Sequence, residues 1–163
     1  MHPEQKRRKI KQEGKDAGST VGSGRDELLF TGMKQYRPTG KKWVLVMEND
    51  KILQKVTRRI LEKAGYGVYM TDSGDDVIEC YGIAKHCGYH FAAVILDLNT
   101  PHGKGGVETI GKLRAIDPEV RAIISTGKVS DSEITNYRKH GFRSVLAKPF
   151  KPKELKQALL EAL

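Results

Sequence analysis

Residues 92–97, Ala-Ala-Val-Ile-Leu-Asp, run an apolar segment directly into a carboxylate. A short uninterrupted apolar run is typical of a strand that is buried on both faces, as the strands of parallel sheets are. In such sheets, ligands bind where the strands end and the loops begin. Asp97 is therefore predicted to lie where α/β folds carry out chemistry, and a carboxylate there can serve as metal ligand, base or nucleophile.

Further apolar runs of the same kind alternate with segments of helical periodicity. The predicted strands cover 43–47, 67–71, 92–97, 121–125 and 144–147. The predicted helices cover 50–64, about 73–87, 107–116, a segment that stops at Gly141, and a last segment striped by Leu155, Ala158, Leu159 and Ala162. This alternation predicts an α/β fold, a doubly wound five-stranded parallel sheet with helices on both faces. Right-handed crossovers leave few topologies, and the flavodoxin-like order 2-1-3-4-5 is the common solution.

Local signals mark where several of these helices begin and end. Ser73 has a residue type that caps helix N-termini, and Ser130 with Glu133 forms a capping-box pair. Gly65 and Gly141 follow the last residues of their predicted helices, where glycine commonly ends a helix. These signals support the division of the chain into strand–helix pairs.

The chain has 163 residues, which predicts one domain, and a formal net charge of +9. Residues 1–41 are rich in Lys, Gln, Glu, Gly and Ser and are predicted to be a basic, mostly disordered leader. Residues 42–163 are predicted to form the folded domain. A short helix over 26–36 is a further possibility within the leader. A basic tail can bind nucleic acid or anionic lipid, but a solvated leader is favoured, so neither is expected as a partner.

Composition also argues against a membrane-spanning or secreted protein. No stretch approaches the roughly 20 apolar residues of a membrane span, and the first residues do not resemble a secretory signal. Cys80 and Cys87 are too few for a disulfide framework and suit a reducing, cytoplasmic compartment. His86 and His90 lie near both thiols, but the spacing matches no standard zinc pattern, so packed or idle thiols are favoured.

Polar side chains follow four of the predicted strands. They are Glu48-Asn49-Asp50 after the first strand, Asp97 after the third, Ser125-Thr126-Gly127 after the fourth and Lys148-Pro149-Phe150 after the fifth. In the order 2-1-3-4-5 these strands are consecutive neighbours, so their carboxyl ends are expected to converge on one cleft. The cleft would combine carboxylates, an amide, a hydroxyl and an ammonium group.

That set of groups suits a phosphoryl group. A carboxylate such as Asp97 can attack phosphorus and form an acyl phosphate, provided that counter-charge is present. Mg²⁺ prefers oxygen ligands, usually one or two carboxylates together with phosphate and water. Lys148 can act as a point charge on the phosphate, and the Thr126 hydroxyl can bond a phosphoryl oxygen. Gly127 would leave room for the incoming group.

These residues, in this order, resemble the receiver domains of two-component response regulators. The resemblance covers about residues 43–163 and rests on the acidic segment after the first strand, Leu-Asp-Leu-Asn-Thr-Pro at 96–101, Thr126-Gly127 and Lys148-Pro149-Phe150. Each motif alone has low specificity, but the ordered set is specific. The amino-acid sequence at 105–110 and 141–150 is most similar to that of receivers attached to hybrid sensor histidine kinases.

The resemblance implies roles for individual residues. Asp97 would accept a phosphoryl group from the phosphohistidine of a sensor histidine kinase or a phosphotransfer protein. Glu48, Asn49, Asp97 and the backbone carbonyl of Asn99 would hold Mg²⁺. Thr126 and Lys148 would contact the phosphoryl oxygens, and Lys148-Pro149 would be a cis peptide, which X-Pro bonds tolerate. Such a domain is a phosphoacceptor and not an enzyme, beyond self-catalysed aspartyl phosphorylation and dephosphorylation.

The resemblance also implies that phosphorylation switches protein–protein interactions through the surface around the fourth and fifth helices. Two departures from the family pattern bear on this function. Asn49 stands where the family usually has a second acid, and one unit charge about 4 Å away contributes on the order of 4 kcal/mol at an effective dielectric near 20. Asp50 is interpreted as a helix cap and not as a replacement ligand. Val145 stands where the family often has an aromatic switch residue.

Asn49 therefore keeps a second interpretation open: a pseudo-receiver that acts as an interaction module without being phosphorylated. The loop at 102–106, His-Gly-Lys-Gly-Gly, lacks the spacing of a phosphate-binding loop and is interpreted as a flexible connection.

Overall fold

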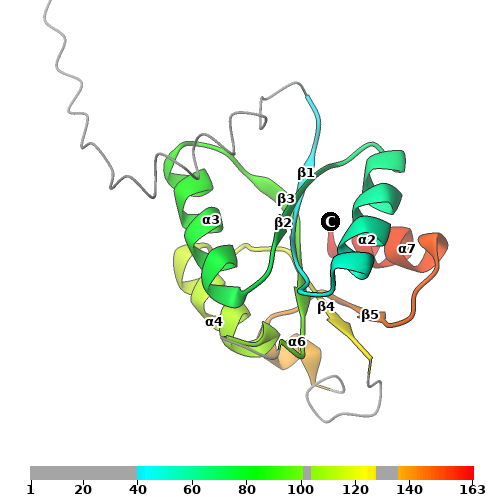
Figure 1. The fold of residues 1–163 in the computed structure, drawn as a ribbon. Helices are drawn as coiled ribbons and strands as arrows, with labels where there is room; N and C mark the ends of the chain where they lie inside the picture. The colour runs from blue at the N-terminus through cyan, green and yellow to red at the C-terminus, as the bar shows by residue number, and fades with distance from the viewer. Residues whose placement is uncertain (1–39, 101–103, 128–135) are drawn as a thin grey trace, which may run out of the picture.

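The computed structural model describes residues 40–100, 104–127 and 136–163 (Figure 1). Its strands are β1 Trp43–Met47, β2 Gly67–Thr71, β3 Phe91–Asp97, β4 Ala122–Thr126 and β5 Ser144–Ala147. Its helices are α2 Lys51–Lys63, α3 Gly74–His86, α4 Gly106–Ile116, α6 Tyr137–His140 and α7 Pro152–Ala162. The predicted leader and the capping box of Ser130 and Glu133 fall outside the described residues. The domain limits of 1–41 and 42–163 stay predictions.

The strands form one parallel sheet in the order β2-β1-β3-β4-β5, which confirms the predicted fold class and topology. The apolar runs of the sequence are the strands, because side chains on both faces of a central parallel strand are buried. Along β1, Leu45 and Met47 face one side, while Val44 and Val46 face the other. All four are at most 2% exposed.

Helices cover the two faces of the sheet in separate groups (Figure 1). Helices α3 and α4 bury Val77, Cys80, Ile110 and Leu113 against one face. Helices α2 and α7 cover the other face with a second core cluster, whose helical members are Ile60, Leu61, Leu155, Ala158, Leu159 and Ala162. The sheet is thus held rigidly between two helical layers, and the carboxyl ends of its strands are fixed relative to one another.

The ends of the helices agree with the local signals of the sequence. The Asp50 carboxylate accepts hydrogen bonds from the backbone of Ile52 at 2.7 Å and of Leu53 at 3.1 Å, so Asp50 is the N-cap of α2, as predicted. The Ser73 hydroxyl caps α3 by accepting from the Asp76 amide. Gly141 ends α6 with a φ of 99°, a left-handed conformation that favours glycine.

The Trp43 ring and the Cys80 thiol pack away from the carboxyl ends of the strands. The Trp43 ring lies over Gly67 of the neighbouring strand, and a Cβ atom on Gly67 would come within 2.3 Å of it. Cys80 is fully buried in α3, and burial raises the pKa of its thiol to about 12. Within the described residues, no group of three or more His, Cys, Asp and Glu side chains could hold a metal ion, and both cysteines are free thiols. No helix among these residues is both long and apolar enough to cross a bilayer.

Gly74, at the start of α3, makes the closest approach between α3 and the segment that leads into α4. A Cβ atom at Gly74 would lie 2.2 Å from the Thr109 hydroxyl oxygen and 2.5 Å from the Lys104 carbonyl oxygen. The hydroxyl can rotate away, but the backbone carbonyl cannot move without shifting the loop.

We therefore expect Gly74→Ala to lower the free energy of unfolding by about 1–3 kcal/mol, the usual range for overpacking. Gly111 is the matched control, because it lies inside α4 and its Cβ would meet nothing within 4 Å. Gly111→Ala should raise stability by about 0.5–1 kcal/mol, since alanine favours a helix. Urea denaturation of wild type and the two variants tests this prediction. A Gly74→Ala protein as stable as wild type would contradict it.

Candidate functional site

The carboxyl ends of β1, β3 and β5 bring three charged side chains together. The Lys148 ammonium lies 2.9 Å from Asp97 Oδ2 and 2.6 Å from Glu48 Oε2. The two carboxylate side chains are each 7% exposed, and Lys148 is 15% exposed. Lysine at this position is thus the counter-charge that allows two buried carboxylates to lie close together.

The backbone fixes each member of this cluster. Asp97 is the last residue of β3, and its Oδ1 accepts a hydrogen bond from the Asn99 amide at 3.1 Å. Glu48 Oε1 accepts from the Asp50 amide at 3.0 Å, so both carboxylates use their second oxygen for the turn that follows their strand. Lys148 donates its own backbone N–H to the Thr126 carbonyl at 2.7 Å, which fastens the end of β5 to the end of β4.

The cluster shifts the titration of Lys148. Burial lowers the pKa of the Lys148 ammonium, but its hydrogen bonds to Glu48 and Asp97 act in the opposite direction and hold the pKa above its ordinary value. The group is therefore charged at neutral pH despite its burial.

Thr126 and Gly127 lie at the carboxyl end of β4, between the strand that carries Asp97 and the strand that precedes Lys148. Thr126, the last residue of β4, is fully buried. Gly127 follows it, and a Cβ atom there would meet nothing within 4 Å, so this position leaves open space next to the strand end. The Lys148-Pro149 peptide bond is cis, as the family resemblance implied. Val145, which stands where the family often has an aromatic switch residue, is half-buried and packs against the core cluster under α3 and α4.

The predicted magnesium ligands are oxygen donors on two neighbouring strand ends, which fits the ligands that Mg²⁺ prefers. Glu48 and Asp97 supply two carboxylates, and Asn49 and the Asn99 carbonyl supply neutral oxygens. The Asp50 carboxylate is engaged in capping α2, and hydrogen bonds from Leu53 and Ile52 lower its pKa. The donor set therefore fits Mg²⁺, with two carboxylates and two neutral oxygens but without a third carboxylate. The roles of these residues stay predictions.

Sequence reasoning missed a second polar network beside Glu48. The Gln54 side-chain amide donates to the Glu48 backbone carbonyl and, at 2.6 Å, to Asp72, which follows β2. Lys51 pairs with the same Asp72 carboxylate at 2.5 Å, and this hydrogen bond lowers the pKa of Asp72. The rule that strand ends gather polar groups would have identified Asp72 had it been applied to β2 as well.

The segment that follows Asp97 also makes close contacts with α3 and α4. Gly106, the first residue of α4, packs so closely that a Cβ atom would lie 2.8 Å from the Asp97 carbonyl oxygen. Lys104 forms an ion pair with Asp75 in the first turn of α3. The connection after β3 is thus fastened to both helices on its side of the sheet.

The family model for the response regulator receiver domain matches residues 44–160. The chain belongs to this family. Among curated relatives, the transcription factor SKN7 of Candida albicans is 29% identical over 118 residues, which is 72% of this chain and 20% of that protein. The corresponding region of Saccharomyces cerevisiae SKN7 is 28% identical and is 18% of that protein. The chain thus matches about a fifth of the length of these relatives.

Smaller relatives match over nearly their whole length. The chemotaxis protein CheY of Thermotoga maritima is 25% identical over 119 residues, which is 72% of this chain and 94% of that protein. The receiver domain of sensor histidine kinase PA1611 from Pseudomonas aeruginosa, solved with magnesium coordinated in its active-site cleft, has a TM-score of 0.65. It is 23% identical and covers 75% of this chain and 97% of its own. At this identity the structural likeness shows the fold alone.

The importance of the lysine can be tested by Lys148→Met, which removes the charge and keeps an apolar stem. The variant should lose about 3 kcal/mol in its free energy of unfolding, because two buried carboxylates lose their partner. Lys148 has a higher pKa folded than unfolded, so its contribution is complete below the ordinary value of 10.5 and is lost as the pH rises through the folded value. The stability difference between wild type and variant should therefore be complete at about pH 8 and smaller at about pH 11.

Urea denaturation at the two pH values measures this difference. Lys156→Met on the exposed side of α7 is the control and should change stability by less than about 0.5 kcal/mol at either pH. A pH-independent difference for Lys148→Met would show that its loss reflects packing and not charge.

Proposed function

We propose that this receiver domain is a phosphoacceptor of a two-component phosphorelay, with Asp97 as the phosphorylated residue. The observation that carries the proposal is the placement of Asp97, at the end of β3, within 2.9 Å of the Lys148 ammonium, which follows β5. A nucleophilic carboxylate needs a nearby cation when its reaction partner is also an anion. The partner would be a sensor histidine kinase or a phosphotransfer protein.

In the proposed step, an Asp97 carboxylate oxygen attacks phosphorus as the phosphorus–nitrogen bond of a partner phosphohistidine breaks. The product is an acyl phosphate on Asp97, and the electron pair of the broken bond returns to the histidine. Lys148 would offset the charge of the phosphoryl group, Thr126 would donate its hydroxyl hydrogen to a phosphoryl oxygen, and the space beside Gly127 would admit the group. Mg²⁺ bound by Glu48, Asn49, Asp97 and the Asn99 carbonyl would add a second source of positive charge.

Under this proposal the chain is not an enzyme for another substrate, because the group that reacts is its own carboxylate. Its chemistry is limited to self-catalysed phosphorylation and dephosphorylation of Asp97. A cytoplasmic location is part of the same proposal, since the two free thiols suit a reducing compartment.

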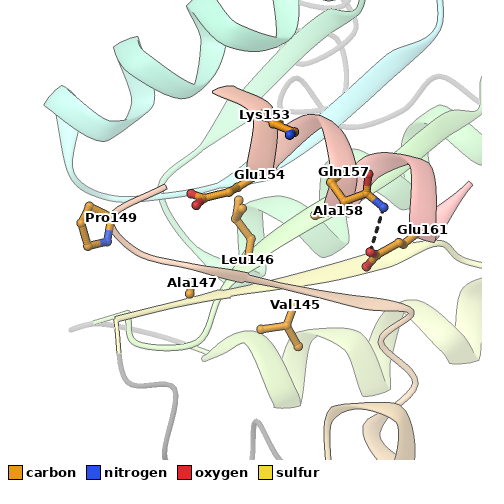
Figure 2. Close-up of a pocket in the computed structure, with 9 residues that line it drawn as sticks. All are labelled: Val145, Leu146, Ala147, Pro149, Lys153, Glu154, Gln157, Ala158 and Glu161. Carbon is orange, nitrogen blue, oxygen red and sulfur yellow. Dashed lines mark hydrogen bonds between the residues drawn. The ribbon is translucent and has the colours of Figure 1, made fainter. Parts of the chain in front are cut away.

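The proposed output is a change in protein binding at the surface around α6 and α7. Beside α7, a cavity of about 470 Å³ runs along β5, the edge strand of the sheet (Figure 2). It is lined by Val145, Leu146 and Ala147 of β5, by Pro149, and by Lys153, Glu154, Gln157, Ala158 and Glu161 of α7. Because β5 leads directly from this cavity to Lys148, a shift at the phosphorylation site can reach it. Moving such an equilibrium from 1:99 to 99:1 requires about 5.5 kcal/mol, for which the two phosphoryl charges are a plausible source.

Asn49 favours a second candidate function, a pseudo-receiver that binds its partners without being phosphorylated. The structure adds one observation in its favour. Lys148 already offsets Glu48 and Asp97, while no third carboxylate in the described parts of the chain joins them. The two functions differ in one measurable property, the formation of an acyl phosphate on Asp97.

Incubation with Mg²⁺ and acetyl phosphate should add one phosphoryl group to the protein, seen by intact-mass spectrometry. Asp97→Asn should abolish the adduct, because an amide cannot form the acyl phosphate. Lys148→Met should reduce its rate by more than about tenfold, since one developing charge loses its counter-ion. No adduct on a folded wild-type protein would favour the pseudo-receiver.

Restoring the missing charge is the complementary experiment. Asn49→Asp should lower the Mg²⁺ concentration that gives half-maximal phosphorylation by about tenfold or more, because a third carboxylate would face the cation. Gln157→Glu on α7 adds the same charge away from the strand ends and should leave the Mg²⁺ dependence unchanged. An equal response of the two variants would show that overall charge, and not residue 49, sets the affinity.

A further inference from the structure

A second cavity lies at the opposite end of β5 from Lys148. It has a volume of about 490 Å³ and is lined by Arg138, Phe142, Arg143 and Glu161. Arg138 belongs to α6, Arg143 directly precedes β5, and Glu161 lies in the last turn of α7. The cavity is therefore built from the same elements as the proposed output surface, but it lies at the amino end of the strand, away from the phosphorylation site.

Two guanidinium groups, those of Arg138 and Arg143, line this cavity, and a third lies beside the turn that precedes Phe142. Arg114 of α4 lies against the turn at Gly141, where a Cβ atom would come within 2.5 Å of its Cδ and 3.0 Å of its Nη1. Arg138 lies over the Tyr137 ring, 5.4 Å from its centroid, and its Nε donates to the Tyr137 hydroxyl. These contacts orient the two side chains without neutralising them.

The acidic groups nearby neutralise the arginines only weakly. Arg143 Nη2 lies 3.8 Å from Glu119, whose side chain is 90% exposed, and such surface pairs contribute little. Its Nη1 donates to the Ala162 carbonyl at 3.4 Å, a long hydrogen bond. Glu161 already accepts a hydrogen bond from Gln157 (Figure 2). Within residues 40–100, 104–127 and 136–163, Arg138 forms no ion pair.

We propose that this cavity binds an acidic segment of a protein partner, with carboxylates of the segment on Arg138 and Arg143. Planar guanidinium groups bind carboxylates through paired hydrogen bonds, which a lysine cannot form. The cavity has room for a few side chains, and Glu161 in its lining would repel a continuous chain of phosphates. A short acidic peptide fits these features better than nucleic acid does. The proposal gives a partner chemistry to the α6–α7 surface and rests on that part of the proposed function, but not on phosphorylation.

The test uses the full chain and a fluorescein-labelled peptide of alternating Glu and Gly, with a Gln–Gly peptide of the same length as reference. Fluorescence anisotropy should show binding of the acidic peptide, weakened about tenfold or more by Arg138→Gln with Arg143→Gln, which corresponds to about 1.4 kcal/mol. Arg59→Gln with Lys63→Gln, an equal loss of charge on the exposed side of α2, should change the affinity less than about twofold. Equal weakening by both pairs, or no binding, would overturn the proposal.

Three further measurements distinguish the possible explanations of the result. Arg138→Lys with Arg143→Lys keeps the charge and should still weaken binding several-fold, so it also serves if the Gln variant fails to fold. Asp97→Asn should bind the peptide like wild type, so a failure of phosphorylation leaves this result intact. A labelled DNA duplex should bind more weakly than the peptide, with no sensitivity to Arg138 and Arg143. Tighter DNA binding that depends on these arginines would identify a nucleic-acid surface and overturn the proposal.

Discussion

The ammonium group of Lys148 is the interaction on which the carboxyl edge of the sheet depends. It pairs with Glu48 after β1 and Asp97 at the end of β3, while its backbone is hydrogen-bonded to the last residue of β4. One residue thus joins the ends of four neighbouring strands. Two buried carboxylates this close would repel each other without it, because buried charges are tolerated only when they are paired. The same arrangement leaves a buried cation beside the Asp97 carboxylate.

The fold was predictable because its local and long-range signals agree. Each apolar run between 43 and 147 became a strand, with limits that differ by at most one residue, since burial on both faces demands that pattern. The convergence of Glu48, Asp97 and Lys148 followed from the predicted strand order. The cap formed by Asp50 was also correct, because a carboxylate before an amphipathic helix has a local backbone partner wherever the helix packs.

The contacts that could not be predicted depend on tertiary distance and on side-chain length. Gln54 and Asp72 are 18 residues apart, and only the packing of α2 beside β2 shows that the amide reaches the carboxylate. The Lys104–Asp75 pair likewise joins the segment before α4 to the first turn of α3, and no periodicity specifies the distance between them. The sequence also gave no sign that Arg138 and Arg143 line one cavity, because the turn at Gly141 sets their relative direction. Charged side chains at turns are common and carry little information until neighbouring elements are placed.

The packing of Trp43 over Gly67 has a practical consequence. Trp43 is the one tryptophan of the chain, and it lies at the amino end of β1, the full length of the strand from Glu48. Its ring lies over Gly67 of the edge strand β2, which pairs with β1, so its fluorescence emission depends on whether the two strands are paired. Intrinsic fluorescence is therefore a natural optical probe of unfolding in this chain that is well separated from events at the strand termini.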